Sequence, residues 1–132
     1  MNWLHEKRLV IIGGTTGLGL SAAIAFIKEG ARVVVVGRSE ESVTEANRLL
    51  NKNGFAFSGD ACNESVAQQA IDACIEKFNG FDGLYHVAGG SGRRFGDGPL
   101  HELSLEGWNK TFEINLTALM LSNRAAAQTF LK

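Results

Sequence analysis

Residues 11–21, with the sequence IIGGTTGLGLS, decide the fold of this chain. A short apolar run ends in four glycines separated by threonines and a leucine, and a helical pattern follows. A strand that turns through glycines into a helix is well suited to bind phosphate groups, because the first amides of a helix have no partner within it and the helix dipole is positive there. Two different phosphate-binding loops fit these letters.

One candidate is the loop of nucleoside triphosphatases, which follows the pattern G-x-x-x-x-G-K-[ST]. Gly14, Gly19 and Ser21 fall at the required positions, but Leu20 stands where the pattern has lysine. That lysine reaches the β- and γ-phosphates, and an apolar side chain cannot supply its charge. The sequence therefore disfavours a triphosphatase.

The other candidate is the dinucleotide-binding turn, which Gly13, Gly17 and Gly19 match as G-x-x-x-G-x-G. In this interpretation Gly13 permits the tight turn, Gly17 lets the backbone approach a pyrophosphate, and Gly19 lets the helix lie close to the strand. The other loop residues that we assign to this contact are Thr15, Thr16 and Leu18.

The rest of the chain continues the alternation of strand and helix. Runs rich in β-branched or aromatic residues predict four strands, at residues 8–12, 31–36, 55–60 and 83–90. Helical patterns lie between them, and Asn63 is expected to cap the third, at residues 63–80. Parallel strands joined through helices predict a Rossmann-type doubly wound sheet in three α/β/α layers, forming one dinucleotide-binding domain over residues 1–132.

The end of the second predicted strand indicates which dinucleotide is bound. NAD-binding domains usually place an acidic side chain there, against the ribose 2′-hydroxyl. This chain has Gly37 followed by Arg38 and by Ser39, which is also the expected N-cap of the next helix. No carboxylate repels a 2′-phosphate, and a guanidinium can pair with one. We therefore expect NADP(H) rather than NAD(H).

Composition excludes several other classes of function. Thirteen basic and fourteen acidic side chains leave a formal net charge of -1, so no broad basic surface for nucleic acid or an anionic membrane is expected. Cys62 and Cys74 have no partners at metal-ligand spacing and are interpreted as reduced, half-buried small side chains. No segment is apolar for long enough to span a membrane or to form a leader peptide. We expect a cytoplasmic protein with no metal site.

Four motifs in order resemble the short-chain dehydrogenase/reductase family. GGTTGLG is similar to the family's T-G-x-x-x-G-x-G, with Ile12 in place of the threonine. GD at 59–60 is similar to the segment after the third strand, and HVAGG at 86–90 to N-N-A-G, with His86 and Val87 replacing both asparagines. EINLTALMLSNRAA, from residue 113, is similar to the helix that carries the active-site asparagine. The resemblance covers essentially the whole chain.

The resemblance implies roles for individual residues. Asp60 would face the adenine amino group, and Ala61 would offer its backbone to it. Asn115 would help to hold a proton-relay water, and Ile114 would line the nicotinamide side. At the fourth strand, the residues implied to contact the cofactor are His86 through its backbone, Ala88 and Gly89. We expect the imidazole of His86 to be structural rather than catalytic.

The resemblance also implies an oxidoreductase that transfers hydride between a nicotinamide and an alcohol or carbonyl substrate. The family's serine and Tyr-x-x-x-Lys pair do not occur in these 132 residues, and the single tyrosine, Tyr85, is predicted to lie inside a buried strand. We therefore expect the cofactor-binding part of a longer enzyme, truncated after its fourth strand and a long helix and inactive by itself. The alternative is a non-catalytic NADP(H)-binding sensor or interaction module.

The last third of the chain carries two further patterns. Residues 89–104 predict a surface loop, in which Arg93 and Arg94 either meet an acidic group of the substrate or are solvated charges. A long helical pattern follows from Ser104, and its apolar residues either pack in the core or, as the resemblance implies, contact a second subunit in a homo-oligomer. These residues are Trp108, Phe112, Leu116, Leu119 and Met120.

Overall fold

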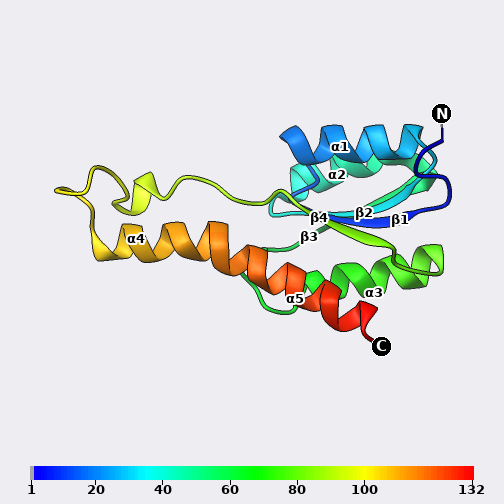
Figure 1. Cartoon of the computed structure of the whole chain (residues 1–132). Helices are drawn as coiled ribbons and strands as arrows, with labels where there is room; N and C mark the ends of the chain where they lie inside the picture. Colours follow the sequence, from blue (N-terminus) through cyan, green and yellow to red (C-terminus); the bar gives the residue numbers. More distant parts are fainter. Residues whose placement is uncertain (1) are drawn as a thin grey trace.

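A four-stranded parallel sheet lies between two layers of helices in the computed structural model, which describes residues 2–132 (Figure 1). Its order is β3-β2-β1-β4. The strands are β1 (Arg8–Ile12), β2 (Arg32–Gly37), β3 (Gly54–Ser58) and β4 (Gly83–His86). All three neighbouring pairs are parallel. The predicted Rossmann-type α/β fold is confirmed.

Two helices cover each face of the sheet (Figure 1). The helices that connect the strands are α1 (Gly17–Lys28), α2 (Glu40–Leu50), which continues into a short 3-10 turn η1 (Asn51–Asn53), and α3 (Val66–Phe78). After β4 come a 3-10 turn η2 (Arg93–Phe95), α4 (Leu105–Phe112), a π-helical segment η3 (Glu113–Thr117) and α5 (Ala118–Phe130). Helices α1 and α2 lie on one face, and α3 and α5 on the other.

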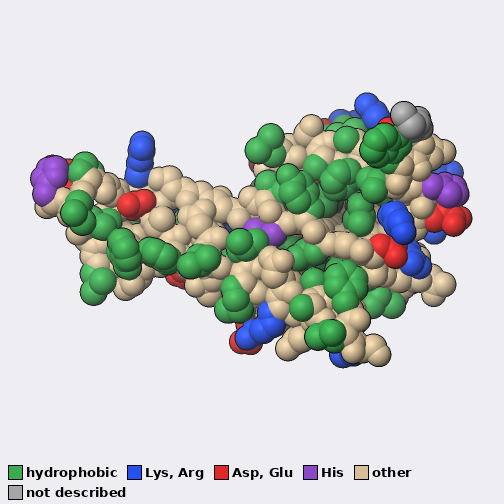
Figure 2. All heavy atoms as spheres, viewed as in Figure 1, with side chains coloured by type: hydrophobic (Ala, Val, Ile, Leu, Met, Phe, Trp, Pro, Cys, Tyr) green, Lys and Arg blue, Asp and Glu red, His purple; other side chains and the backbone are tan. Residues whose placement is uncertain are grey.

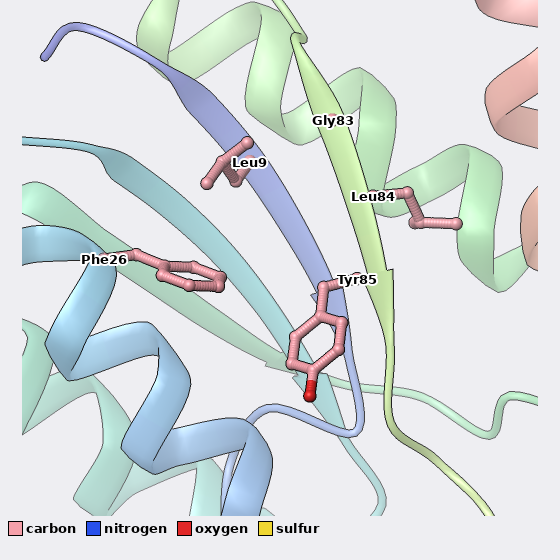
Figure 3. Close-up of a pocket in the computed structure, with 5 residues that line it drawn as sticks. All are labelled: Leu9, Phe26, Gly83, Leu84 and Tyr85. Atoms are coloured by element: carbon pink, nitrogen blue, oxygen red, sulfur yellow. The ribbon is translucent and has the colours of Figure 1, made fainter. Parts of the chain in front are cut away.

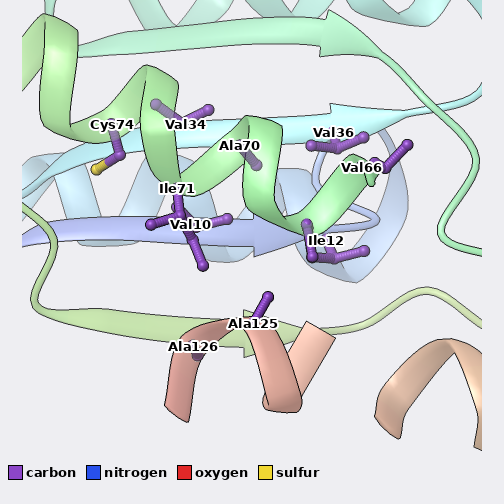
Figure 4. Packing of buried hydrophobic residues seen from close by; sticks show 11 residues of the cluster. Val10, Ile12, Val34, Val36, Val66, Ala70, Ile71, Cys74, Ala125 and Ala126 are labelled. Atoms are coloured by element: carbon purple, nitrogen blue, oxygen red, sulfur yellow. The ribbon is translucent and has the colours of Figure 1, made fainter. Parts of the chain in front are cut away.

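The two central strands are buried on both faces because their apolar residues alternate between the two layers of helices. Val10 and Val34 pack against α3 and α5 (Figure 4), whereas Ile11 and Val33 pack toward α1 and α2. All four side chains have no exposed surface. Burial of each such aliphatic side chain stabilises the fold by about 1.5–3 kcal/mol, which explains why continuous rather than alternating apolar runs mark these strands.

The chain reverses direction across the sheet at β1. It passes from β1 outward to β2 and β3, and α3 then carries it back to the other side of β1, where β4 pairs. At the carboxyl ends of β1 and β4, the connection that follows β1 therefore leads toward β2, and the connection that follows β4 leads away from it. In open parallel sheets this point leaves a crevice that can accept a ligand.

The third helix and the fourth strand are shorter than predicted. Asn63 does not cap α3: its side chain accepts hydrogen bonds from the amide and hydroxyl of Ser65, and the helix begins only at Val66. An asparagine that closes a turn onto the backbone two residues later competes with its use as a cap. β4 ends at His86 because the amides of Val87 and Ala88 both donate to the Ile12 carbonyl, at 2.8 and 2.9 Å, and so leave the ladder.

Tyr85 is not buried, contrary to the prediction. Its side chain is 43% exposed, because β4 is an edge strand and has no neighbour on its outer side within residues 2–132. Its ring lies 6.1 Å from that of Phe26. Leu9, Gly83 and Leu84 also line a shallow hollow of about 190 Å³ here, with the Leu84 side chain pointing away from Phe26 and Tyr85 (Figure 3).

The long C-terminal helix is interrupted. A π-helical turn at Glu113–Thr117 separates α4 from α5, and α4 projects with the preceding segment beyond the sheet (Figure 1). The apolar side chains that were predicted to pack in the core or against a second subunit are 39–55% exposed, and hydrophobic side chains appear along α4 in Figure 2. Packing within residues 2–132 therefore does not explain why these side chains are apolar.

Neither cysteine is in a disulfide; Cys74 is fully buried rather than half-buried, and Cys62 is partly buried.

His86 ties the end of β4 to α5. One ring nitrogen, Nε2, lies 2.9 Å from the carbonyl oxygen of Ala88 and must donate to it, so Nδ1 of the neutral ring accepts from the Ser122 hydroxyl at 2.7 Å. Ser122 is only 1% exposed. Burial lowers the pKa of His86, and the hydrogen bond to Ala88 opposes this only in part. Both ring nitrogens are therefore engaged within the protein, and the structural role expected of the imidazole stays a prediction.

The start of β4 is tied to β1 by a salt bridge. The Asp82 carboxylate accepts from the backbone amide, Nε and Nη2 of Arg8, at 2.8, 2.7 and 3.0 Å. Arg8 Nη1 also donates to the Asn79 carbonyl at 2.7 Å. The Arg8 guanidinium lowers the pKa of Asp82 to about 2. This pair fixes the loop before the edge strand.

Asp82→Asn is expected to lower the urea midpoint at neutral pH, because Asn offers Arg8 one accepting oxygen instead of two and no negative charge. The stabilisation by Asp82 is present above the ordinary aspartate pKa and is lost as the pH falls toward 2, so the two proteins should converge in acid. Glu45→Gln, which breaks an exposed pair within α2, is the control and should shift the midpoint less. Equal shifts for both variants would show that the Arg8–Asp82 pair stabilises the fold no more than an exposed pair does.

His86→Asn is expected to remove one component of the pH dependence of stability. Since the folded state lowers the His86 pKa, the unfolded chain takes up the proton more readily, and the free energy of unfolding falls as the pH drops below about 6.5. Urea unfolding between about pH 7.5 and 5 should show this fall in the wild type and a smaller one in the variant. His101→Asn, at an exposed histidine, is the control. Parallel profiles for wild type and His86→Asn would contradict the assignment.

Candidate functional site

A cleft of about 970 Å³ lies at the carboxyl ends of the strands, where the chain reverses across the sheet. Every strand contributes to it through the residues that follow it. From the ends of β1 and β2 come Ile12, Gly13, Thr15, Thr16, Gly17, Leu18, Val36, Gly37, Arg38, Ser39 and Ser42. From the segments after β3 and β4 and from α4 and η3 come Gly59, Asp60, Ala61, Cys62, Val87, Ala88, Gly89, Gly90, Ser91, Arg94, Phe95, Lys110 and Ile114.

The glycine-rich turn forms the wall of this cleft above β1. Gly13 has φ +87°, and a Cβ there would lie 2.6 Å from the Ala88 amide nitrogen. A Cβ on Gly19 would lie 1.9 Å from the Gly13 carbonyl oxygen, so α1 rests directly on the end of β1. Gly17 has φ +53°, but a Cβ there would meet nothing within 4 Å. Two of the glycines are thus required by packing, whereas Gly17 leaves open space beside the cleft.

The start of α1 presents unused amides. Its backbone ladder begins with the Leu20 amide, which donates to the Thr16 carbonyl at 3.1 Å, and the Thr16 side chain makes no capping hydrogen bond. No acidic residue lies in the first turn. The amides of Gly13 and Gly14, by contrast, both donate to Val36 at 2.9 Å. An anion can therefore be met by the amides after Gly14, where the helix dipole is positive.

The end of β2 is shaped to present Arg38. A Cβ on Gly37 would lie 1.8 Å from Thr15 Oγ1, so only glycine lets the two segments meet. The Thr15 hydroxyl in turn lies 3.0 Å from that of Ser42. Ser39 caps α2 as predicted, since its hydroxyl accepts from the Ser42 amide at 3.3 Å. The guanidinium of Arg38 is exposed at the cleft and makes no ion pair or hydrogen bond within residues 2–132.

Asp60 follows β3 at the far side of the cleft. One of its carboxylate oxygens accepts from the Cys62 amide at 2.9 Å, which fixes the side chain over the start of the following turn. The Cys62 thiol lies 3.8 Å from the Glu113 carbonyl, and burial raises its pKa. Cys62 is therefore a protonated wall residue between Asp60 and η3 rather than a reactive thiolate.

Hydrogen bonds from side chains outside the cleft hold the segment after β4 in place. His86 holds the Ala88 carbonyl, as described above, and Asn115 holds Gly90: its Nδ2 donates to the Gly90 carbonyl at 2.7 Å, and its Oδ1 accepts from the Gly90 amide at 3.0 Å. A Cβ on Gly89 would lie 2.7 Å from the same Oδ1. The backbone at 88–90 thus faces the cleft in a fixed conformation.

The structure brings most of the predicted binding residues together. Three do not line the cleft: Gly19 lies beneath Gly13, and the side chains of His86 and Asn115 act from behind the wall. The residues that sequence reasoning did not assign to the cleft include Cys62, Ser91, Phe95 and Lys110. Cys62 and Ser91 lie within two residues of predicted ones, whereas Phe95 and Lys110 come from a turn and a helix that meet the sheet only through tertiary packing.

The lining is cationic. Its one carboxylate is Asp60, whereas Arg38, Arg94 and Lys110 are basic. Among residues 2–132 no three His, Cys, Asp or Glu side chains cluster closely enough to hold a metal ion. None of the helices in this part of the chain is long and apolar enough to cross a membrane. The charge of this lining is suited to an extended organic anion.

Comparison with known proteins gives the same picture. The family model described as short chain dehydrogenase matches residues 7–132. Over 134 aligned residues the chain is 34% identical to 2,5-dichloro-2,5-cyclohexadiene-1,4-diol dehydrogenase LinX of Sphingobium indicum, covering 99% of this chain and 52% of that protein. It is 30% identical over 131 residues to the short-chain dehydrogenase/reductase olcF of Penicillium canescens, covering 98% and 48%.

Solved structures agree with the fold. A short chain dehydrogenase from Bacillus anthracis superposes with a TM-score of 0.83 at 32% identity, covering 96% of this chain and 50% of that one. A short-chain dehydrogenase/reductase from Brucella melitensis gives 0.82 at 25% identity, covering 94% and 52%. The chain spans about half the length of the curated relatives it matches. With the match over 7–132 and the parallel sheet that carries the glycine turn, the chain belongs to the short chain dehydrogenase family.

Proposed function

We propose that these residues form the NADP(H)-binding part of an oxidoreductase that acts on an alcohol or carbonyl substrate. The observation that carries the proposal is the cleft at the carboxyl ends of the strands, with open amides at one wall and an unpaired Arg38 at another. The diol dehydrogenase among the relatives supports the substrate class. The family's Tyr-x-x-x-Lys pair is not among these residues, so we further propose that they do not turn over substrate alone.

The wall above β1 fits the diphosphate of a dinucleotide. Gly17 leaves the backbone accessible, and the α1 amides face the same space without an acidic neighbour. Oriented amides and a helix N-terminus stabilise phosphate oxygens without a counter-ion. When bound, the nicotinamide cofactor supplies hydride transfer, and the protein positions it.

Arg38 would select the phosphorylated dinucleotide. Its guanidinium has no acidic partner within residues 2–132, and Gly37 before it places no carboxylate at the end of β2. A 2′-phosphate could accept two parallel hydrogen bonds from its planar fork, with Ser39 and Ser42 nearby. Asp60 would face the adenine, with Ala61 beside it.

The remaining predicted residues would position the other end of the cofactor. The backbone at Ala88 and Gly89 and the side chain of Ile114 line the cleft after β4, where the nicotinamide would lie. Asn115 would act by holding Gly90 in place, since both ends of its amide are already engaged. It is a positioning residue in this proposal.

Calorimetric titration with NADPH and with NADH tests the assignment of Arg38. We expect NADPH to bind at least about tenfold more tightly, because charge-assisted contacts to the 2′-phosphate are each worth roughly 1.5–3 kcal/mol. Arg38→Asp should abolish or reverse the preference. Arg32→Asp, at the opposite end of the same strand, is the charge-matched control and should leave it unchanged. Equal affinities for the two cofactors in the wild type would refute the NADP(H) assignment.

Gly17→Ala tests the diphosphate contact separately from folding. The Cβ would meet no protein atom, so the variant should fold with a loss of about 1 kcal/mol from the left-handed backbone conformation. It should nevertheless bind NADPH at least about tenfold more weakly, because the methyl group would occupy the approach to the backbone amides. Gly98→Ala, with an equally open Cβ outside the cleft, should bind normally. Unchanged NADPH affinity in Gly17→Ala would place the phosphates elsewhere.

A further inference from the structure

The segment after β4 presents one arginine to the cleft and a neighbouring one to solvent. Arg94 lines the cleft, whereas Arg93 is exposed and does not. Both belong to the 3-10 turn η2. Their different positions raise the question of what anion Arg94 would meet.

The turn that carries Arg94 is fastened to α4. Ser104 donates from its hydroxyl to the Phe95 carbonyl at 3.1 Å and from its amide to the Gly96 carbonyl at 3.0 Å. The Thr111 hydroxyl donates to the Asp97 carboxylate at 3.0 Å. Arg94 is therefore held at the cleft by an ordered turn, and is not a charge on a free loop.

The guanidinium itself is also positioned. It lies over the Phe95 ring at 4.8 Å from the centroid, and it makes no ion pair or hydrogen bond within residues 2–132. The other cation here, Lys110, lies 5.5 Å from the same ring but pairs with Glu113 at 3.0 Å. Arg94 is thus the unneutralised charge at this end of the cleft, with its planar fork oriented by stacking.

The position of Arg94 separates it from the phosphate contacts proposed above. In the strand order β3-β2-β1-β4, Arg38 follows β2 and the glycine turn follows β1, while Arg94 follows β4 on the other side. Between them lie Ala88 and Gly89, where the nicotinamide would be placed. An anion at Arg94 would therefore lie beyond the nicotinamide, on the side of the reacting substrate.

We propose that Arg94 binds a carboxylate of the substrate, so that the substrate class is carbonyl or alcohol compounds that bear a carboxylate close to the reacting carbon. This inference rests on the proposed function, since it takes the position of the nicotinamide from it. A carboxylate matches the fork of a guanidinium through two parallel hydrogen bonds, and such contacts orient the ligand as well as binding it.

The test uses the 132-residue protein saturated with NADPH and the probe oxamate, a small carbonyl carboxylate, with its neutral analogue oxamide. Binding is followed by NMR through the amides of Gly89–Ser91 and the Nε of Arg94. We expect oxamate to bind saturably, on the order of millimolar, and oxamide not to bind. Arg94→Gln should weaken oxamate binding at least about tenfold, whereas Arg93→Gln, the matched control, should leave it unchanged.

Two results would overturn the proposal. The first is oxamate binding that is absent in the wild type or equally affected in both arginine variants. The second is a loss of NADPH affinity in Arg94→Gln, which would assign the anion to a phosphate of the cofactor instead. Failure of the proposed function is distinguishable, because NADPH would then fail to bind the wild type and Arg93→Gln as well. Since Arg94 is exposed, its variant should fold, and its amide spectrum away from the cleft checks this.

Discussion

Three segments meet at Gly13 without room for a single additional carbon. The start of α1 presses on the Gly13 carbonyl through Gly19, and the segment after β4 presses on its α-carbon through Ala88. Because interiors are close-packed, such contacts cannot be relieved by small shifts. This approach of backbone to backbone places the open end of α1 and the segment after β4 on two sides of one cleft. The positions of the other lining residues depend on it.

The parallel sheet was predictable because its signals are local. Continuous apolar runs at β1 and β2 and glycines at their ends are read directly from the sequence, and Gly13 and Gly37 have the close contacts that such glycines imply. The exposure of Tyr85 on β4 was not predictable in this way. The run that contains Tyr85 looks like any buried strand, and its exposure follows from strand order, which a single run of residues does not encode.

The candidate site shows the same difference between residues that local sequence patterns predict and residues that only the fold brings together. Residues within one strand-turn-helix unit, such as Thr16 and Arg38, could be assigned from their spacing. Which of Arg93 and Arg94 lines the cleft, and the contribution of Lys110, could not, because they depend on how η2 folds back against α4. The partners of His86 belong to the same category: Ser122 lies on a helix remote in sequence, and only the assembled fold shows that its hydroxyl donates to the ring.

The π-helical turn between α4 and α5 limits how many residues the chain can have between these two helices. A π turn holds one residue more than the α-helical turn it replaces, and each residue of an α-helix rotates the next by about 100°. Deleting one residue between Glu113 and Thr117 would therefore rotate Ser122 away from His86 while leaving α4 in place. Insertions and deletions in descendants of this sequence should accordingly be absent from this turn and accumulate instead around Gly98, where the backbone is open to solvent.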